Sequence, residues 1–128
     1  QEASLRYVAK VADFGMNGIR ACGHLDCSNP YMAPEAQAGR FTEKSDVYSF
    51  GQIMVRTFCP RAGKTPIGGE DKGKVAEWLI HEWKSTHQPV SDQHCTDIAA
   101  WICKSVGSNA DMRPSFDRSG QALLSLRE

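Results

Sequence analysis

The chain has 128 residues, of which 41% are apolar and 23% are charged, and its 15 basic and 15 acidic side chains give a formal net charge of +0. This length and composition predict a single globular domain with a core of its own. The balanced charge argues against a nucleic-acid-binding or membrane-surface protein, and no apolar run approaches the length of a membrane span.

The cysteines and the first residues indicate the compartment. The N-terminal stretch QEASLRYVAK lacks the apolar core of a signal peptide, so export is not indicated, although a cleaved targeting segment would leave no trace. An odd number of cysteines, two of them within helical patterns, is typical of reduced thiols rather than of a disulfide framework. The five are Cys22, Cys27, Cys59, Cys95 and Cys103. We therefore expect an intracellular protein, in the cytoplasm.

In chain order, the sequence predicts one strand, one long loop and then helices. Residues 5–12 (LRYVAKVA) alternate loosely and favour a strand. Residues 16–29 have no period and are rich in Gly and Asn, so they predict a loop. Residues 42–46 carry helix-start chemistry, and the apolar positions of residues 47–58 (VYSFGQIMVRTF) predict a helix buried on most sides.

The second half predicts a surface loop followed by three helices. Residues 60–73 are rich in Gly, Pro and Lys and predict the loop. The expected helices cover residues 75–83, 93–106 and 114–126, and the last of them has Pro114 at a favoured first-turn position. No internal repeat is present. The sequence thus predicts a mainly α fold, with a short N-terminal strand and about four helices.

Two binding motifs are weak. PRAGKTP, at residues 60–66, lacks the earlier glycine of a phosphate-binding loop, because Phe58 stands there. Cys22, His24 and Cys27 could supply three zinc ligands, with Cys95 or His94 as a fourth. The paired-Cys spacing of structural zinc sites is missing, so a loop with incidental Cys and His is the favoured interpretation.

A third set of motifs is far more specific. KVADFG, YMAPE, TEKSDVYSFG and RPSF follow one another in this order, at residues 10–15, 31–35, 42–51 and 113–116. Together they resemble a eukaryotic protein kinase, most closely the tyrosine-kinase-like branch of serine/threonine kinases. The resemblance covers nearly all of residues 1–128 and implies the large helical lobe of that fold, from the strand before Asp13 to the last helix.

The resemblance implies roles for the first motifs. Asp13 matches the carboxylate that holds Mg²⁺ against the phosphates of ATP. Phe14 matches the packing residue that distinguishes active from inactive states, and Gly15 the flexible point beside it. Residues 16–32 match the activation segment, in which Ser28 and Tyr31 would lie near the protein substrate. Cys27 stands where the family usually has a glycine.

The later motifs imply structural roles. Glu35 and Arg113 match a buried ion pair that joins the end of the activation segment to the loop before the last helix, and a solvated Glu35 is the alternative. Asp46 matches a carboxylate that accepts hydrogen bonds from the catalytic loop, and it would also suit the start of a helix. Trp78 and Trp83 match a docking helix and could anchor a protein partner, or they could pack in the core.

The rest of a kinase's machinery is not found in these residues. The glycine-rich loop, the phosphate-binding lysine with its glutamate, the catalytic aspartate and the second metal-binding asparagine have no match, so the N-lobe and the catalytic loop are absent. We therefore expect a fragment of a protein kinase that uses Mg·ATP when intact and binds no cofactor and has no activity alone. The alternative is a noncatalytic, pseudokinase-like interaction module or structural subunit, whose partner would cover the exposed face of the lobe.

Overall fold

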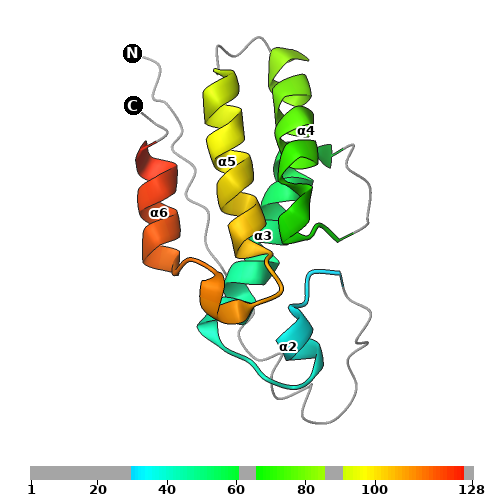
Figure 1. The fold of residues 1–128 in the computed structure, drawn as a ribbon, viewed down its shortest axis with the longest axis vertical. Coiled ribbons are helices and arrows are strands. Elements are labelled where there is room, and N and C mark those ends of the chain that lie inside the picture. The colour runs from blue at the N-terminus through cyan, green and yellow to red at the C-terminus, as the bar shows by residue number, and fades with distance from the viewer. Residues whose placement is uncertain (1–29, 61–65, 86–90, 126–128) are drawn as a thin grey trace, which may run out of the picture.

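The computed structural model describes residues 30–60, 66–85 and 91–125 of the chain (Figure 1). These residues form helices and no strand. The α-helices are α2 (Pro34–Gln37), α3 (Glu43–Phe58), α4 (Lys72–Ser85), α5 (Asp92–Ser105) and α6 (Phe116–Ser125), and two single 3₁₀ turns are η2 (Gly69–Asp71) and η3 (Ala110–Met112). The mainly helical prediction is confirmed. The strand expected at residues 5–12 and the loop at residues 16–29 lie outside the described residues.

Helix α3 passes behind α4 and α5 and begins where the sequence places its start signals (Figure 1). The backbone N–H of Thr42 donates to Ser45 Oγ at 3.2 Å, which satisfies a donor at the helix start that has no partner within the helix. Val47 and Val55 are fully buried, whereas Ile53 is 47% exposed. The helix is therefore buried on most sides, as expected, but one side of it reaches the surface.

The core lies between α3 and the pair formed by α4 and α5, which run side by side in opposite directions (Figure 1). Val75 and Leu79 of α4 and Ile102 of α5 are completely buried. Within each of these helices the buried apolar residues are three or four positions apart, so their side chains lie on one face. Burial of these faces supplies the main stabilisation of the fold.

Helix α6 is attached to this core by aromatic side chains. Trp101 of α5 donates from Nε1 to Ser119 Oγ of α6 at 3.1 Å. The Phe50 ring of α3 meets the rings of both Trp101 and Phe116 edge to face, with centroids 5.9 and 6.1 Å apart. These contacts place the start of α6, and the segment before it, against the first half of α3.

Several element boundaries differ from the sequence-based expectation, and two of these differences have a clear local cause. The loop expected to reach residue 73 ends earlier, because Asp71 Oδ2 accepts the Gly68 N–H at 3.0 Å and starts η2, which leads directly into α4. The last helix begins at Phe116 rather than at Pro114. Ser115 Oγ accepts the N–H of Arg118 at 3.3 Å and so takes the N-cap position.

At Gly51, α3 comes close to the end of α5. A Cβ atom at this position would lie 2.8 Å from Val106 Cγ1 and 3.0 Å from Ser105 Cβ. We expect Gly51→Ala to destabilise the fold by about 1–3 kcal/mol, because the overpacking outweighs the better helix propensity of alanine. The measurement is the urea midpoint of unfolding.

Gly120→Ala in α6 is the matched control, since a Cβ there meets nothing within 4 Å. The better helix propensity of alanine then acts alone, and the control should stabilise the chain by about 0.5–1 kcal/mol. Equal gains for the two variants would show that the helices do not meet closely at Gly51.

Candidate functional site

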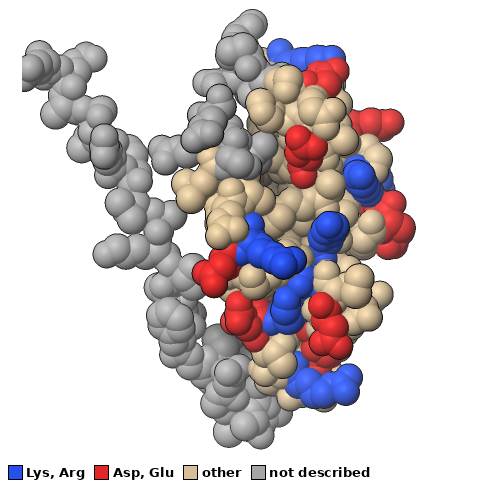
Figure 2. Space-filling view, turned by 60° about the vertical axis from the view of Figure 1, so that its left-hand side comes forward, with Lys and Arg blue, Asp and Glu red and all other residues tan. Residues whose placement is uncertain are grey.

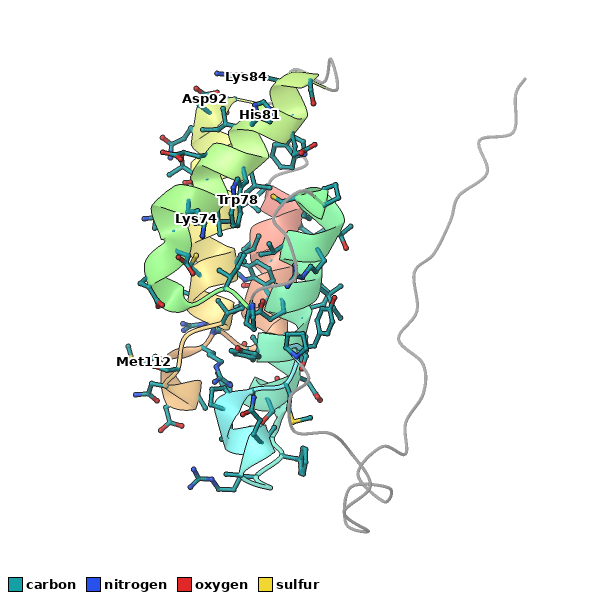
Figure 3. All side chains as sticks on the ribbon, turned by 90° about the vertical axis from the view of Figure 1, so that its right-hand side faces the viewer. Lys74, Trp78, His81, Lys84, Asp92 and Met112 are labelled. Atoms are coloured by element: carbon teal, nitrogen blue, oxygen red, sulfur yellow. The ribbon has the colours of Figure 1, made fainter. Side chains whose placement is uncertain are left out.

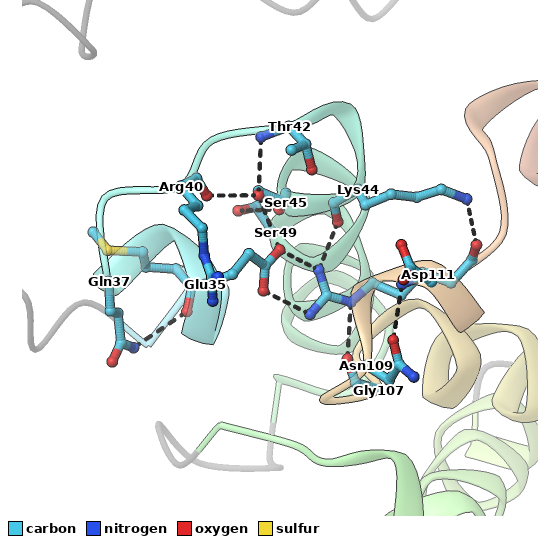
Figure 4. A network of polar contacts seen from close by, with 12 residues as sticks. Glu35, Gln37, Arg40, Thr42, Lys44, Ser45, Ser49, Gly107, Asn109 and Asp111 are labelled. Carbon is cyan, nitrogen blue, oxygen red and sulfur yellow. Dashed lines mark hydrogen bonds and ion pairs between the residues drawn. The ribbon is translucent and has the colours of Figure 1, made fainter.

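The centre of the site is an ion pair between Glu35 and Arg113, which are 78 positions apart in the sequence (Figure 4). Glu35 lies in the first turn of α2, and Arg113 directly follows η3. Arg113 Nη1 donates to Glu35 Oε1 at 2.6 Å, and Nη2 donates to Oε2 at 3.0 Å. This is the two-pronged geometry in which a guanidinium matches a carboxylate best.

The Arg113 side chain is fully enclosed, and its remaining donors face main-chain oxygens. Nε donates to the Gly107 carbonyl at 2.8 Å, and Nη1 also donates to the Lys44 carbonyl at 2.9 Å. The guanidinium also lies over the Tyr48 ring, 5.1 Å from its centroid, where the ring's negative face attracts it. A single side chain thus joins α2, the start of α3 and the segment before α6.

Glu35 is held in place from its own side as well. Ser45 Oγ donates to its Oε1 at 2.9 Å, and 13% of the side chain is exposed. The hydrogen bond from Arg113 is the main cause that lowers the pKa of Glu35 to about 2, against the opposing effect of burial. Glu35 therefore stays ionised at any physiological pH, and the alternative of a solvated helix-start charge does not describe it.

The backbone around α2 fixes the direction of Glu35. Gly39 has a φ of +86°, a conformation that glycine adopts without strain, and the chain can therefore turn so that the Arg40 N–H donates to the Glu35 carbonyl at 2.9 Å. Ahead of α2, Ser49 Oγ of α3 donates to the Tyr31 carbonyl at 2.6 Å. The segment that carries the Ala-Pro-Glu motif is thereby fastened to α3 ahead of Glu35 and turns back on itself after it.

The structure places only some of the other candidate residues. Asp46 lies exposed in the first turn of α3, and the Tyr31 side chain is 37% exposed. Asp13, Phe14, Gly15 and Ser28 lie outside the described residues, as does the magnesium position that Asp13 would define. The sequence did not single out Lys44 or Gly107, whose contributions to the Arg113 network are main-chain carbonyls.

The zinc interpretation gains no support in the described part of the chain. Cys22, His24 and Cys27 lie outside it, and no group of three or more His, Cys, Asp or Glu side chains could hold a metal within it. The His94 ring hydrogen-bonds through Nδ1 to Ser91 Oγ at 3.0 Å. Cys95 is buried, and this burial raises the pKa of its thiol.

The other two described cysteines are free and buried. Burial raises the pKa of both Cys59 and Cys103 to about 11, so neither is a reactive thiolate at neutral pH.

Both tryptophans of α4 pack against the core with part of their surface exposed. Trp83 meets the ring of Phe58 edge to face at 5.9 Å, and Lys74 Nζ lies 5.0 Å from the centroid of Trp78 (Figure 3). Core packing accounts for the buried parts of both side chains. None of the described helices combines the length and apolarity needed to cross a membrane.

Comparison with known proteins identifies the class to which this arrangement belongs. The family model described as protein tyrosine and serine/threonine kinase matches residues 4–123, so the chain belongs to the protein kinase family. The Glu35–Arg113 pair joins two of the motifs that carry the resemblance.

Curated relatives from Arabidopsis thaliana are receptor-like protein kinases. A probable receptor-like protein kinase is 38% identical over 86 residues, covering 61% of this chain and 10% of its own length. Receptor-like protein kinase ANXUR2 is 33% identical over 95 residues, which cover 67% of this chain and 11% of the relative. Receptor-like protein kinase FERONIA is 33% identical over 87 residues, which cover 62% of this chain and 10% of the relative. The chain spans about a tenth of the length of these relatives. No solved structure matches.

Proposed function

We propose that the chain is the C-terminal lobe of a serine/threonine protein kinase, which transfers the γ-phosphoryl group of ATP to a hydroxyl group of a protein substrate. The observation that carries this proposal is the enclosed, two-pronged Glu35–Arg113 pair. It fixes the end of the proposed activation segment to the body of the lobe. A substrate-binding segment must be held in this way if it is to present a hydroxyl group reproducibly to ATP.

In this proposal the residues of the chain hold the metal, the substrate and the catalytic loop in position and do not themselves react. Asp13 would hold Mg²⁺, and Phe14 and Gly15 would set the orientation of the Asp13 side chain. Mg·ATP supplies the transferable phosphoryl group, with the metal neutralising charge on the phosphates. Ser28 and Tyr31 would line the path of the substrate, and the Ser49 hydrogen bond to the Tyr31 carbonyl supports the end of that path. Asp46 would support the catalytic loop.

The partners follow from the same assignment. A protein substrate would dock along the proposed activation segment, and an N-terminal lobe would cover the ATP side of the chain. The buried free thiols of Cys59, Cys95 and Cys103 suit a reducing compartment, which supports a cytoplasmic location. The described helices leave Ile53 of α3 47% exposed, where a further part of a kinase would find apolar surface to cover.

The test is phosphotransfer from radiolabelled ATP to a protein substrate by a protein that joins residues 1–128 to an upstream lobe and catalytic loop. Asp13→Ala should lower the rate at least about a hundredfold, since it removes a ligand of the metal that stabilises the transferring charge. Asp97→Ala, at an exposed position of α5, should leave the rate unchanged. Residues 1–128 alone should transfer no phosphate. An Asp13→Ala protein that works at the unaltered rate would overturn the proposal.

A further inference from the structure

A cavity of about 320 Å³ lies where the start of α3, the end of α5 and the start of α6 meet. Its walls include Lys44, Lys104, Asp111, Met112 and Arg118, and we call it the basic cavity. Its volume lies at the lower end of the range for small-molecule pockets. It therefore suits a single functional group of a ligand better than a whole nucleotide.

The charge of the basic cavity is positive even after internal pairing. Arg113 also lines it, but its charge is matched by Glu35. The three cations Lys44, Lys104 and Arg118 then face one carboxylate, that of Asp111. The excess is two positive charges in a chain whose formal net charge is +0. A doubly charged anion would balance this excess.

The donors of these cations are available to a ligand. Lys44 Nζ donates to the Arg113 carbonyl, which holds the ammonium at the cavity and leaves two of its three donors for other acceptors. Lys104 and Arg118 are exposed, and their side chains form no hydrogen bond or ion pair with the residues that the structure describes. A guanidinium beside ammonium groups is the donor set that binds phosphoryl oxygens well.

The surroundings favour a phosphorylated protein segment over other polyanions. Figure 2 views the side of the molecule on which α6 lies and shows basic side chains near its centre with acidic ones around them. A membrane surface or a nucleic acid would instead call for a broad basic face. Met112 is 76% exposed beside the cavity and offers an apolar contact to a residue that flanks a phosphorylated side chain.

We propose that the basic cavity binds the phosphoryl group of a phosphorylated serine or threonine in a protein segment. Lys44, Lys104 and Arg118 donate to its oxygens, and Met112 contacts the neighbouring residue of that segment. None of the residues that line the basic cavity belongs to the Asp-Phe-Gly motif, and the proposal does not depend on phosphotransfer by the chain. A binding measurement therefore tests it independently of the proposed kinase activity.

The experiment is calorimetric titration of the 128-residue chain with a short phosphoserine peptide that has aliphatic neighbours and no other charge. The phosphorylated peptide should bind at least about tenfold more tightly than its unphosphorylated twin. Replacing Lys104 and Arg118 with glutamine should remove most of this preference. Asp111→Asn should strengthen binding several-fold, because it removes the opposing carboxylate. Unfolding cannot produce such a gain in affinity, so this variant shows that the changes in binding do not come from loss of structure.

The matched control replaces Lys74 and Lys84 of α4, away from Met112 (Figure 3), with glutamine. This variant loses the same charge and should bind the phosphopeptide as the unaltered chain does. Equal losses in the two double variants, or equal binding of the two peptides, would overturn the proposal. It would also be overturned if only inorganic phosphate bound, or if only vesicles of anionic lipid bound through Lys104 and Arg118.

Discussion

Replacing Arg113 with alanine should destabilise the folded chain by about 3–5 kcal/mol, the usual cost of breaking a buried ion pair from one side. The substitution leaves the Glu35 carboxylate with Ser45 as its remaining side-chain partner. It also leaves the Gly107 and Lys44 carbonyls without the donors that Arg113 supplies. Urea unfolding followed by circular dichroism measures the change, which is a large part of the stability of a domain of this size.

Two further variants separate this effect from a general loss of charge. Arg118→Ala removes an exposed arginine and should change stability by no more than about 0.5 kcal/mol. Arg113→Lys keeps the charge but loses the planar fork, so it should still cost most of the stability that Arg113→Ala removes. If Arg113→Ala and Arg118→Ala unfolded at the same urea concentration, the ion pair would not support the fold.

The double variant Glu35→Gln with Arg113→Met should be more stable than the sum of its single changes predicts. With both charges removed, no buried ion is left unpaired, and the methionine can fill part of the space. Additive effects would mean that the two side chains contribute independently, contrary to the distances of 2.6 and 3.0 Å between them.

The longer helices could be predicted because their signals are local. The repeat of apolar residues within residues 47–58 and the polar residues at 42–46 define α3. Helix α2 has four residues, too few for a periodic pattern, and it was not predicted. The start of α6 was placed two residues early, because Pro114 and Ser115 are both favourable near a helix start and only the Ser115 hydrogen bond distinguishes them.

The site was predictable only in part for a different reason. Glu35 and Arg113 were paired through the resemblance to kinases, since no local pattern can link residues 78 positions apart. The partners supplied by Lys44 and Gly107 are main-chain carbonyls, which every residue type possesses. Their part in the network therefore leaves no mark in the sequence. The basic cavity was likewise missed, because Lys44, Lys104 and Arg118 come together only after folding.

The stability of the chain should also fall steeply in acid, because the pKa of Glu35 is lowered from 4.5 to about 2 on folding. A depressed carboxyl pKa stabilises the fold above the unfolded-state value, and this contribution is lost as the pH falls from about 4.5 to about 2. The stabilisation that is lost when Glu35 becomes fully protonated is roughly 3 kcal/mol. The measurement is the free energy of unfolding in urea between pH 7 and pH 2.

The decisive quantity is the difference in stability between the unaltered chain and Glu35→Gln, because this difference isolates the effect of Glu35. Glutamine keeps the shape of Glu35 but does not ionise. At pH 7 the variant should be less stable by about the full contribution of the ionised carboxylate, and the gap should narrow by roughly 3 kcal/mol as the pH approaches 2. A gap that stays constant across this range would show that Glu35 does not carry the acid sensitivity of the fold. The bond to Arg113 would then be too weak to hold two distant segments together.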